Sequence, residues 1–311
     1  MRYPFFSSRP LAGRFRRAQA HVGLDWSDAG LRLVQAAAGR QAVQHHQLDW
    51  PLAAMPAGSA GAQQLAEHLQ QLWQQGDGLP RRVRAALPES MLQRRWLRLP
   101  AGVSASELEA LVQAEWQRQA GADQPELPAL DFQLLPGEAG ATRQEVLVVA
   151  ADRQRLEQLQ QAARVAGLQL LSVDAASHAA HRAAIHGLRQ QPAALQLLLL
   201  HAGSGQLLLQ VLQQGRPWWQ QRLPQQRAGT AGVWLDLVPA LLSALPDPGW
   251  LLAAEAWVAG TDVDADAEHV LSSLQAQTGR AWRCLEPAAG LSPAWLTACG
   301  LAWQQEPTWT P

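Results

Sequence analysis

The sequence predicts an α/β protein of two lobes, with a smaller α+β unit inserted into the first lobe. Two stretches, residues 21–36 and 195–213, each read as a β-hairpin that opens an α/β segment. Between them, residues 88–170 alternate strands and helices in a different order. A chain of 311 residues, 48% hydrophobic and only 16% charged, is long and apolar enough to bury two cores.

The first lobe is expected over residues 21–87, completed by residues 171–190. Residues 27–30 supply turn chemistry for its hairpin. Apolar residues at helical spacing, such as Leu65 and Leu69, predict a helix after the third strand. The expected elements, in chain order, are strands over residues 21–25, 31–36 and 41–50, a helix over 63–75 and a strand over 82–87.

The inserted subdomain is expected over residues 88–170. Ser104 followed by Glu107 forms a capping box, which predicts the start of a helix, and Gly167 is a typical residue for the end of another. The expected elements are a strand over residues 93–99, a helix over 104–120, strands over 130–135 and 145–151, a helix over 152–166 and a strand over 168–173.

The second lobe is expected over residues 191–311. Its elements are strands over residues 195–200, 206–213 and 218–223, a helix near 232–245, a strand within 250–259, a helix over 265–278, a short strand over 281–285 and a final helix over 294–304. Four tryptophans gather around the first helix of this lobe: Trp218, Trp219, Trp234 and Trp250. They indicate either a core or a surface for another subunit.

Composition excludes several classes of protein. The net charge is −1 and the chain contains no lysine, so we expect no nucleic acid as a partner. Cys284 and Cys299 are too few for a disulfide framework and read as buried apolar residues. No Cys/His cluster has the spacing of metal ligands, so no metal is expected.

The N-terminal residues 1–20 contain arginines and aromatic residues but no apolar h-region of a signal peptide. The longest apolar run, residues 193–200, is too short to span a bilayer. We therefore expect a soluble, intracellular protein. The basic tail is either frayed or lies on an anionic membrane surface.

Several segments resemble the PilM family, actin-like proteins of type IV pilus assembly. The order and spacing of these segments carry the resemblance, which extends over nearly the whole chain. They are VGLDWSDAGLRLVQ (residues 22–35), ALPESMLQRRWLRLP (86–100), LDFQLLPG (130–137), QEVLVVAADRQRLEQLQQAARVAGLQLLSVDAAS (144–177) and TACGLAW (297–303).

The resemblance implies a two-lobed, actin-like (ribonuclease-H-like) ATPase fold, with a reduced subdomain in the second lobe. It also implies a cytoplasmic adaptor, peripheral to the inner membrane, that binds the short N-terminal tail of a bitopic PilN-like protein. Other pilus assembly proteins, or a second copy, are further possible partners. The tail groove of the family lies between the first lobe and the inserted subdomain.

The strand that enters the inserted subdomain holds our candidates for that groove, because its apolar residues alternate with polar ones. The candidates are Arg94, Arg95, Trp96, Leu97 and Leu99. For each of them, core packing or an ordinary solvated arginine is the alternative interpretation.

The resemblance also places a vestigial nucleotide site at two hairpin turns. Asp25 occupies the expected acidic position of the first hairpin, and Ser27 stands where the family has a glycine. In the second hairpin, His201 replaces the expected acid, although Gly203, Ser204 and Gly205 retain a turn able to cradle an anion. The third element keeps one glycine, Gly260, followed by Thr261 in place of the second.

These departures predict a pseudo-ATPase with no cofactor, because loss of one acid weakens metal-dependent catalysis. The short segment between residues 223 and 250 removes most of the small subdomain that closes over the nucleotide in relatives. Asp25 is equally well explained as a turn residue that bonds nearby backbone N–H groups. The alternatives are an active actin-fold ATPase that binds Mg-ATP, a GspL-like component of type II secretion, or a paralogue that serves DNA uptake.

Overall fold

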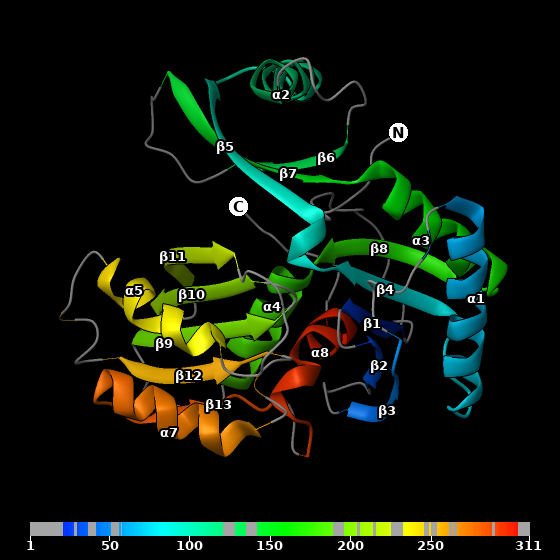
Figure 1. Ribbon diagram of the computed structural model, residues 1–311. Coiled ribbons are helices and arrows are strands. Elements are labelled where there is room, and N and C mark those ends of the chain that lie inside the picture. The colour runs from blue at the N-terminus through cyan, green and yellow to red at the C-terminus, as the bar shows by residue number, and fades with distance from the viewer. Residues whose placement is uncertain are drawn as a thin grey trace, which may run out of the picture.

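The computed structural model describes most of the chain. The described residues are 21–27, 30–36, 42–50, 56, 58–120, 128–134, 142–188, 196–203, 206–213, 216–224, 233–245, 249, 254–260, 263, 266–287 and 290–303. They form two lobes side by side and a small subdomain above them (Figure 1). The N-terminal tail, residues 1–20, lies outside the described residues.

The first lobe is built on a five-stranded sheet in the order β3-β2-β1-β4-β8. Its strands are β1 (Val22–Ser27), β2 (Gly30–Ala36), β3 (Ala42–Leu48), β4 (Arg82–Leu87) and β8 (Gln169–Ala175). β1, β2 and β3 pair antiparallel, whereas β4 and β8 continue the sheet in parallel. Helices α1 (Gly58–Gln74) and α3 (Arg153–Val165) cover its outer face (Figure 1).

The second lobe repeats this topology. Its sheet has the order β11-β10-β9-β12-β13, again an antiparallel meander continued by two parallel strands. The strands are β9 (Gln196–Gly203), β10 (Gln206–Gln213), β11 (Arg216–Pro224), β12 (Glu255–Ala259) and β13 (Trp282–Cys284). Its outer face packs against η3 (Val233–Leu237), α5 (Val238–Ser243) and α7 (Ala267–Thr278).

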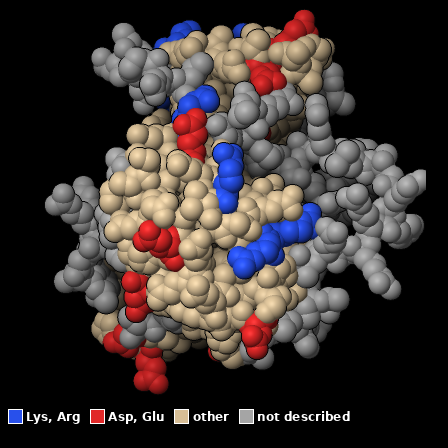
Figure 2. Space-filling view, turned by 90° about the vertical axis from the view of Figure 1, so that its right-hand side faces the viewer, with Lys and Arg blue, Asp and Glu red and all other residues tan. Residues whose placement is uncertain are grey.

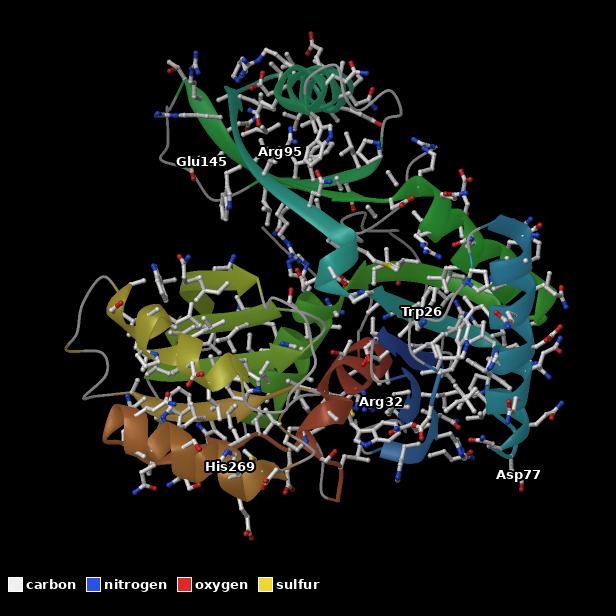
Figure 3. The ribbon with its side chains drawn as sticks, in the orientation of Figure 1. Trp26, Arg32, Asp77, Arg95, Glu145 and His269 are labelled. Atoms are coloured by element: carbon white, nitrogen blue, oxygen red, sulfur yellow. The ribbon has the colours of Figure 1, made fainter. Side chains whose placement is uncertain are left out.

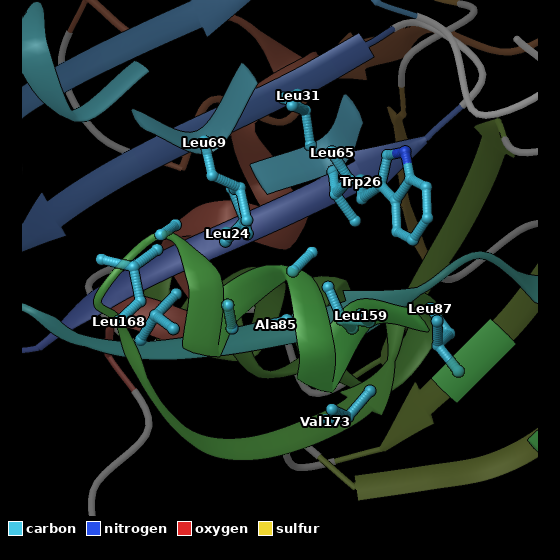
Figure 4. Close-up of a cluster of buried hydrophobic side chains, with 14 of the residues drawn as sticks. Leu24, Trp26, Leu31, Leu65, Leu69, Ala85, Leu87, Leu159, Leu168 and Val173 are labelled. Carbon is cyan, nitrogen blue, oxygen red and sulfur yellow. The ribbon is translucent and has the colours of Figure 1, made fainter. Parts of the chain in front are cut away.

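Alternation along the strands separates core from inner face in both lobes. Figure 4 shows Leu24 and Trp26 of β1 in one buried cluster with residues of α1 and α3. Trp26 thus points into the core, stacked 6.3 Å from Trp50. In the second lobe, Trp234 is buried and Trp219 packs against the same core, whereas the side chains of Trp218 and Trp250 lie outside the described ones.

The inserted subdomain is a three-stranded antiparallel sheet with one helix. Its strands, in the order β5-β7-β6, are β5 (Leu92–Pro100), β6 (Ala129–Leu134) and β7 (Arg143–Ala151). Helix α2 (Ala105–Ala120) covers one face. The capping box is present: the Glu107 N–H donates to Ser104 Oγ, and the Ser104 N–H donates to Glu107 Oε2 at 2.8 Å.

The packing of α3 corrects the expected boundary of the inserted subdomain at residue 170. Leu156 and Leu159 of α3 lie in the core of the first lobe, beside α1. The same apolar stripe that predicted this helix therefore faces the first sheet instead of the inserted one. The inserted sheet ends at β7, and the turn η2 (Glu89–Met91) joins it to β4.

Two helices lie between the lobes, and the sequence analysis did not predict one of them. Helix α4 (Ala176–Leu188) runs from β8 to β9, and α8 (Leu296–Ala302), preceded by η5 (Pro293–Trp295), packs beside it (Figure 1). The helices approach closely because their facing residues are small. A Cβ atom on Gly300 would overlap the Ala179 carbonyl oxygen, and one on Gly23 would overlap that of Ala298.

Gly300→Ala is expected to destabilise the protein, by about 1–3 kcal/mol of unfolding free energy, because the added methyl group forces α4 and α8 apart. Helix propensity alone predicts the opposite sign, a gain of up to about 1 kcal/mol. Urea unfolding decides between the two, with Ala110→Val on the exposed face of α2 as a control. A Gly300→Ala protein as stable as the wild type would contradict this account of the interface.

Candidate functional site

A row of residues crosses the inner face of the first sheet, the face turned toward α4 and α8. Arg32 of β2 pairs in register with Asp25 of β1, Asp25 with Ala86 of β4, and Ala86 with Asp174 of β8. Asp25, Ala86 and Asp174 all stand near the carboxyl ends of parallel strands. Open α/β sheets bind their ligands at this edge.

The Asp25 carboxyl group is buried, with 2% of the residue exposed. Burial raises its pKa to about 6, although the positive charge of Arg32 opposes the rise. Arg32 donates from Nε to Gln47 Oε1 at 3.3 Å, and its guanidinium carbon lies 6.0 Å from the centre of the Trp295 ring. Within the described part of the chain, Arg32 Nη1 and Ser27 Oγ are buried without hydrogen-bond partners.

Asp174 is a second buried carboxylate on this face, which the sequence analysis missed. Its Oδ2 atom lies 2.6 Å from Arg182 Nη1, and its Oδ1 atom lies 3.6 Å from His178 Nδ1. Burial raises the pKa of Asp174, but Arg182 and His178 outweigh burial and hold it below its usual value. An acid at the end of an apolar strand was the pattern that would have revealed it.

The second lobe contributes a different set of groups. His201, near the end of β9, is largely buried, and it lies on the same side of β9 as Leu199, which packs in the cluster between the lobes. Gly203 ends β9 and pairs with Gln206 across the turn. Ser204, Gly205 and Thr261 lie outside the described residues. The sequence-predicted anion cradle therefore stays a prediction.

Gly260 has a structural explanation that needs no ligand. Its φ of 121° lies in the region that favours glycine, and a Cβ atom there would overlap the Ala202 carbonyl oxygen. The close approach of the chain after β12 to β9 thus requires glycine at this position.

The structure divides the five groove candidates between the two faces of β5. Leu97 and Leu99 are buried beneath α2, so core packing accounts for them. The Arg95 guanidinium carbon lies 4.1 Å from the centre of the Trp116 ring, and Nη1 donates to the Trp116 carbonyl oxygen at 3.2 Å. Figure 3 shows Arg95 on the α2 side of the sheet. Leu97 and Leu99 are thus core residues, and Arg95, which is partly buried, is engaged by Trp116 of α2.

Trp96 lies on the opposite face of β5 and is 58% exposed. In register on β7, Leu147 stands opposite Trp96, and Glu145 stands opposite the exposed Arg98. Leu147 is itself buried. We call the three exposed residues, Trp96, Arg98 and Glu145, the Trp96 face. Because α2 covers only the other side of this sheet, an exposed aromatic ring flanked by both signs of charge remains on the surface.

Charged side chains are sparse on the face of the molecule shown in Figure 2. Figure 2 shows the side of the molecule that lies on the right in Figure 1, where acidic and basic side chains are scattered among uncharged ones. Among the described residues, no helix is long and apolar enough to cross a membrane. In the same part of the chain, no three His, Cys, Asp or Glu side chains are placed to hold a metal ion.

Comparison with known proteins identifies the family. A sequence model described as "Type IV pilus assembly protein PilM" matches residues 23–224, more than half of the chain. The chain belongs to the PilM family. The search of curated proteins gave no match.

Solved structures similar to this PilM-family chain confirm its fold. One is a PilM–PilN type IV pilus biogenesis complex, 19% identical, with a TM-score of 0.70 over 91% of this chain and 97% of that chain. Another, from Bacteroides thetaiotaomicron, has an actin-like ATPase fold and is 10% identical over 92% and 96% of the two chains, with a TM-score of 0.52. The cytoplasmic domain of EpsL from Vibrio cholerae is 15% identical over 77% and 82%, with a TM-score of 0.47. The first two of these structures confirm the predicted two-lobed actin-like fold.

Asp25→Asn is expected to stabilise the protein at pH 8 and to have little effect at pH 4. The folded-state pKa of Asp25 is about 6 against 3.8 in the unfolded chain, so its contribution is present below pH 3.8 and lost as pH rises through 6. The difference corresponds to at most about 3 kcal/mol at pH 8. Urea unfolding between pH 4 and pH 8 measures it.

The exposed Asp236, changed to Asn, is the matched control for that experiment. Burial lowers the pKa of His181 to about 4, so His181 makes the protein more stable as pH rises over an overlapping range. The contribution of His181 is the same in the wild type and the variant, so it cancels in the difference between their unfolding free energies. A variant that is less stable than the wild type at pH 8 would show that attraction to Arg32 outweighs the burial of Asp25.

Proposed function

We propose that this chain is an adaptor in the inner-membrane complex of a type IV pilus-type machine, where it binds the short cytoplasmic tail of a PilN-like bitopic protein. The Trp96 face is the observation that carries the proposal. A tryptophan 58% exposed on a sheet face is the kind of anchor that dominates binding energy at interfaces. The fold likeness to a protein solved in complex with PilN supports the choice of partner.

The geometry of β5 suits an extended peptide. β5 is an outer strand in the order β5-β7-β6, and its nine residues offer a long edge. A peptide laid along it places an apolar side chain against the Trp96 ring and a polar or acidic group beside Arg98. A partner anchored in the membrane would hold this chain at the cytoplasmic side of the inner membrane.

We further propose that the chain does not hydrolyse ATP. Mg²⁺ prefers carboxylate and water ligands, and His201 offers an imidazole where the second acid of the site is expected. Asp174 is held by Arg182 and His178, and Arg32 faces Gln47 and Trp295. Asp174 and Arg32 are thus engaged by neighbouring side chains instead of being arranged around a metal–nucleotide complex.

A synthetic N-terminal peptide of the PilN-like protein from the same genome is expected to bind with micromolar affinity in calorimetry. Trp96→Ala is expected to weaken binding at least about tenfold, because truncation of an interface tryptophan removes more than about 1.4 kcal/mol. Val165→Ala, at an exposed apolar residue of α3, is the control and should bind like the wild type. Equal affinity of Trp96→Ala and the wild type would remove the Trp96 face from the proposal.

Mg-ATP is expected to give no binding heat, and phosphate release should equal that of the buffer blank. Asp25→Ala provides the reference, because any ATP signal unchanged in that variant does not come from the hairpin site. Tight Mg-ATP binding that Asp25→Ala abolishes, together with phosphate release, would make the chain an active actin-fold ATPase and overturn the pseudo-ATPase proposal.

A further inference from the structure

A buried ion pair joins the inserted subdomain to the helix between the lobes. Arg94 of β5 donates from both terminal nitrogens to the two carboxylate oxygens of Glu89 in η2. Arg94 Nη2 also donates to Ser177 Oγ at 3.2 Å, and the Ser177 N–H donates to Glu89 Oε1 at 3.2 Å. We call Glu89, Arg94 and Ser177 the latch. It fixes β5 to the first turn of α4.

The latch is buried, which makes it costly to separate. The side chains of Arg94 and Glu89 are 11% and 6% exposed. Burial raises the pKa of Glu89, but Arg94 and Ser177 outweigh burial and keep it below its usual value. Because separation would leave a charge buried without its partner, a shift of β5 is easier if η2 and α4 move with it.

Helix α4 connects the latch to the rest of the molecule through further polar contacts. Arg182, one turn beyond His178, binds Asp174 of the first lobe and donates from Nε to the Gly300 carbonyl oxygen of α8 at 3.5 Å. His181 Nδ1 lies 3.2 Å from Gln210 Oε1 of β10 in the second lobe. One helix thus makes polar contacts with the inserted subdomain, the first lobe, α8 and the second lobe.

The latch also adjoins the Trp96 face. Arg94 and Trp96 are two residues apart on β5, so their side chains leave the same side of the strand. A ligand that shifts β5 by contact with Trp96 displaces Arg94 as well.

We propose that the latch couples the occupancy of the Trp96 face to α4, and through His181 to the second lobe. The identity of the occupant, a PilN-like tail, rests on the proposed function. The coupling itself rests on the contacts between Glu89, Arg94 and Ser177.

Hydrogen exchange on the full chain tests the coupling at residues 181–186 of α4 and at β10, which do not contact the latch. Peptide binding to the wild type is expected to slow exchange there about threefold or more. The double variant Glu89→Met/Arg94→Met leaves no lone charge and keeps the Trp96 face. It should bind the peptide within about fivefold of the wild type and show no such slowing. Glu115→Gln, which breaks the exposed Glu115–Arg118 pair of α2, is the matched control and should respond like the wild type.

Ser177→Ala is the second variant, since it removes one hydrogen bond of the latch without disturbing the ion pair. If the double variant does not fold, Ser177→Ala decides the question, and it should reduce the slowing by at least half. Peptide binding to the wild type without slowing at residues 181–186 would overturn the coupling and leave the proposed function intact. Slowing in either latch variant as large as in the wild type would also overturn the coupling and leave the proposed function intact.

If the peptide does not bind the wild type, the proposed function fails and the comparison without peptide decides the coupling. Faster exchange of residues 181–186 and β10 in the double variant than in the Glu115→Gln control would support the latch. The same rates in both would overturn it.

Discussion

The packing of α4 against α8 is the contact on which the arrangement of the two lobes depends. The residues of α4 at this contact are mostly alanines, and with Gly300 of α8 they let the two backbones approach, while Leu301 of α8 packs on Ala176 and Ala179. The same closeness brings Gly23 of β1 against α8, so the inner face of the first sheet is covered up to the row that contains Asp25 and Asp174. The burial of Asp25 and Asp174, which shifts their pKa values, therefore depends on this packing.

The inner face handles its two carboxylates in different ways. Asp174 is neutralised by Arg182 and His178, and its ionised form is favoured. Asp25 has only Arg32 in register across the hairpin, and burial dominates its titration. A buried carboxylate that lowers stability at neutral pH is typical of a position kept for a reason other than folding.

The inserted subdomain shows how one layer of helix leaves a tryptophan exposed on the other face of a sheet. Its single helix can bury only one face of a three-stranded sheet, so Leu97 and Leu99 become core while Trp96 is left exposed. The buried ion pair beneath that face then ties the exposed strand to α4. The exposed Trp96 and the buried Arg94 are thus only two residues apart along β5.

Local patterns in the sequence were enough to predict the hairpins, the capping box at Ser104 and most strands and helices, because these depend on periodicity and turn residues. The order of the segments was enough for the resemblance to PilM. The face of each helix or strand that is buried, and the element that covers it, depend on the packing of segments that are far apart in the sequence. Helix α4 escaped prediction because its buried residues are alanines, which give little hydrophobic contrast until α8 packs on them. The position of α3, the contact of Arg95 with Trp116 and the pairing of Asp174 were likewise set by elements apart in sequence, because burial and charge depend on the residues on the other side of each contact.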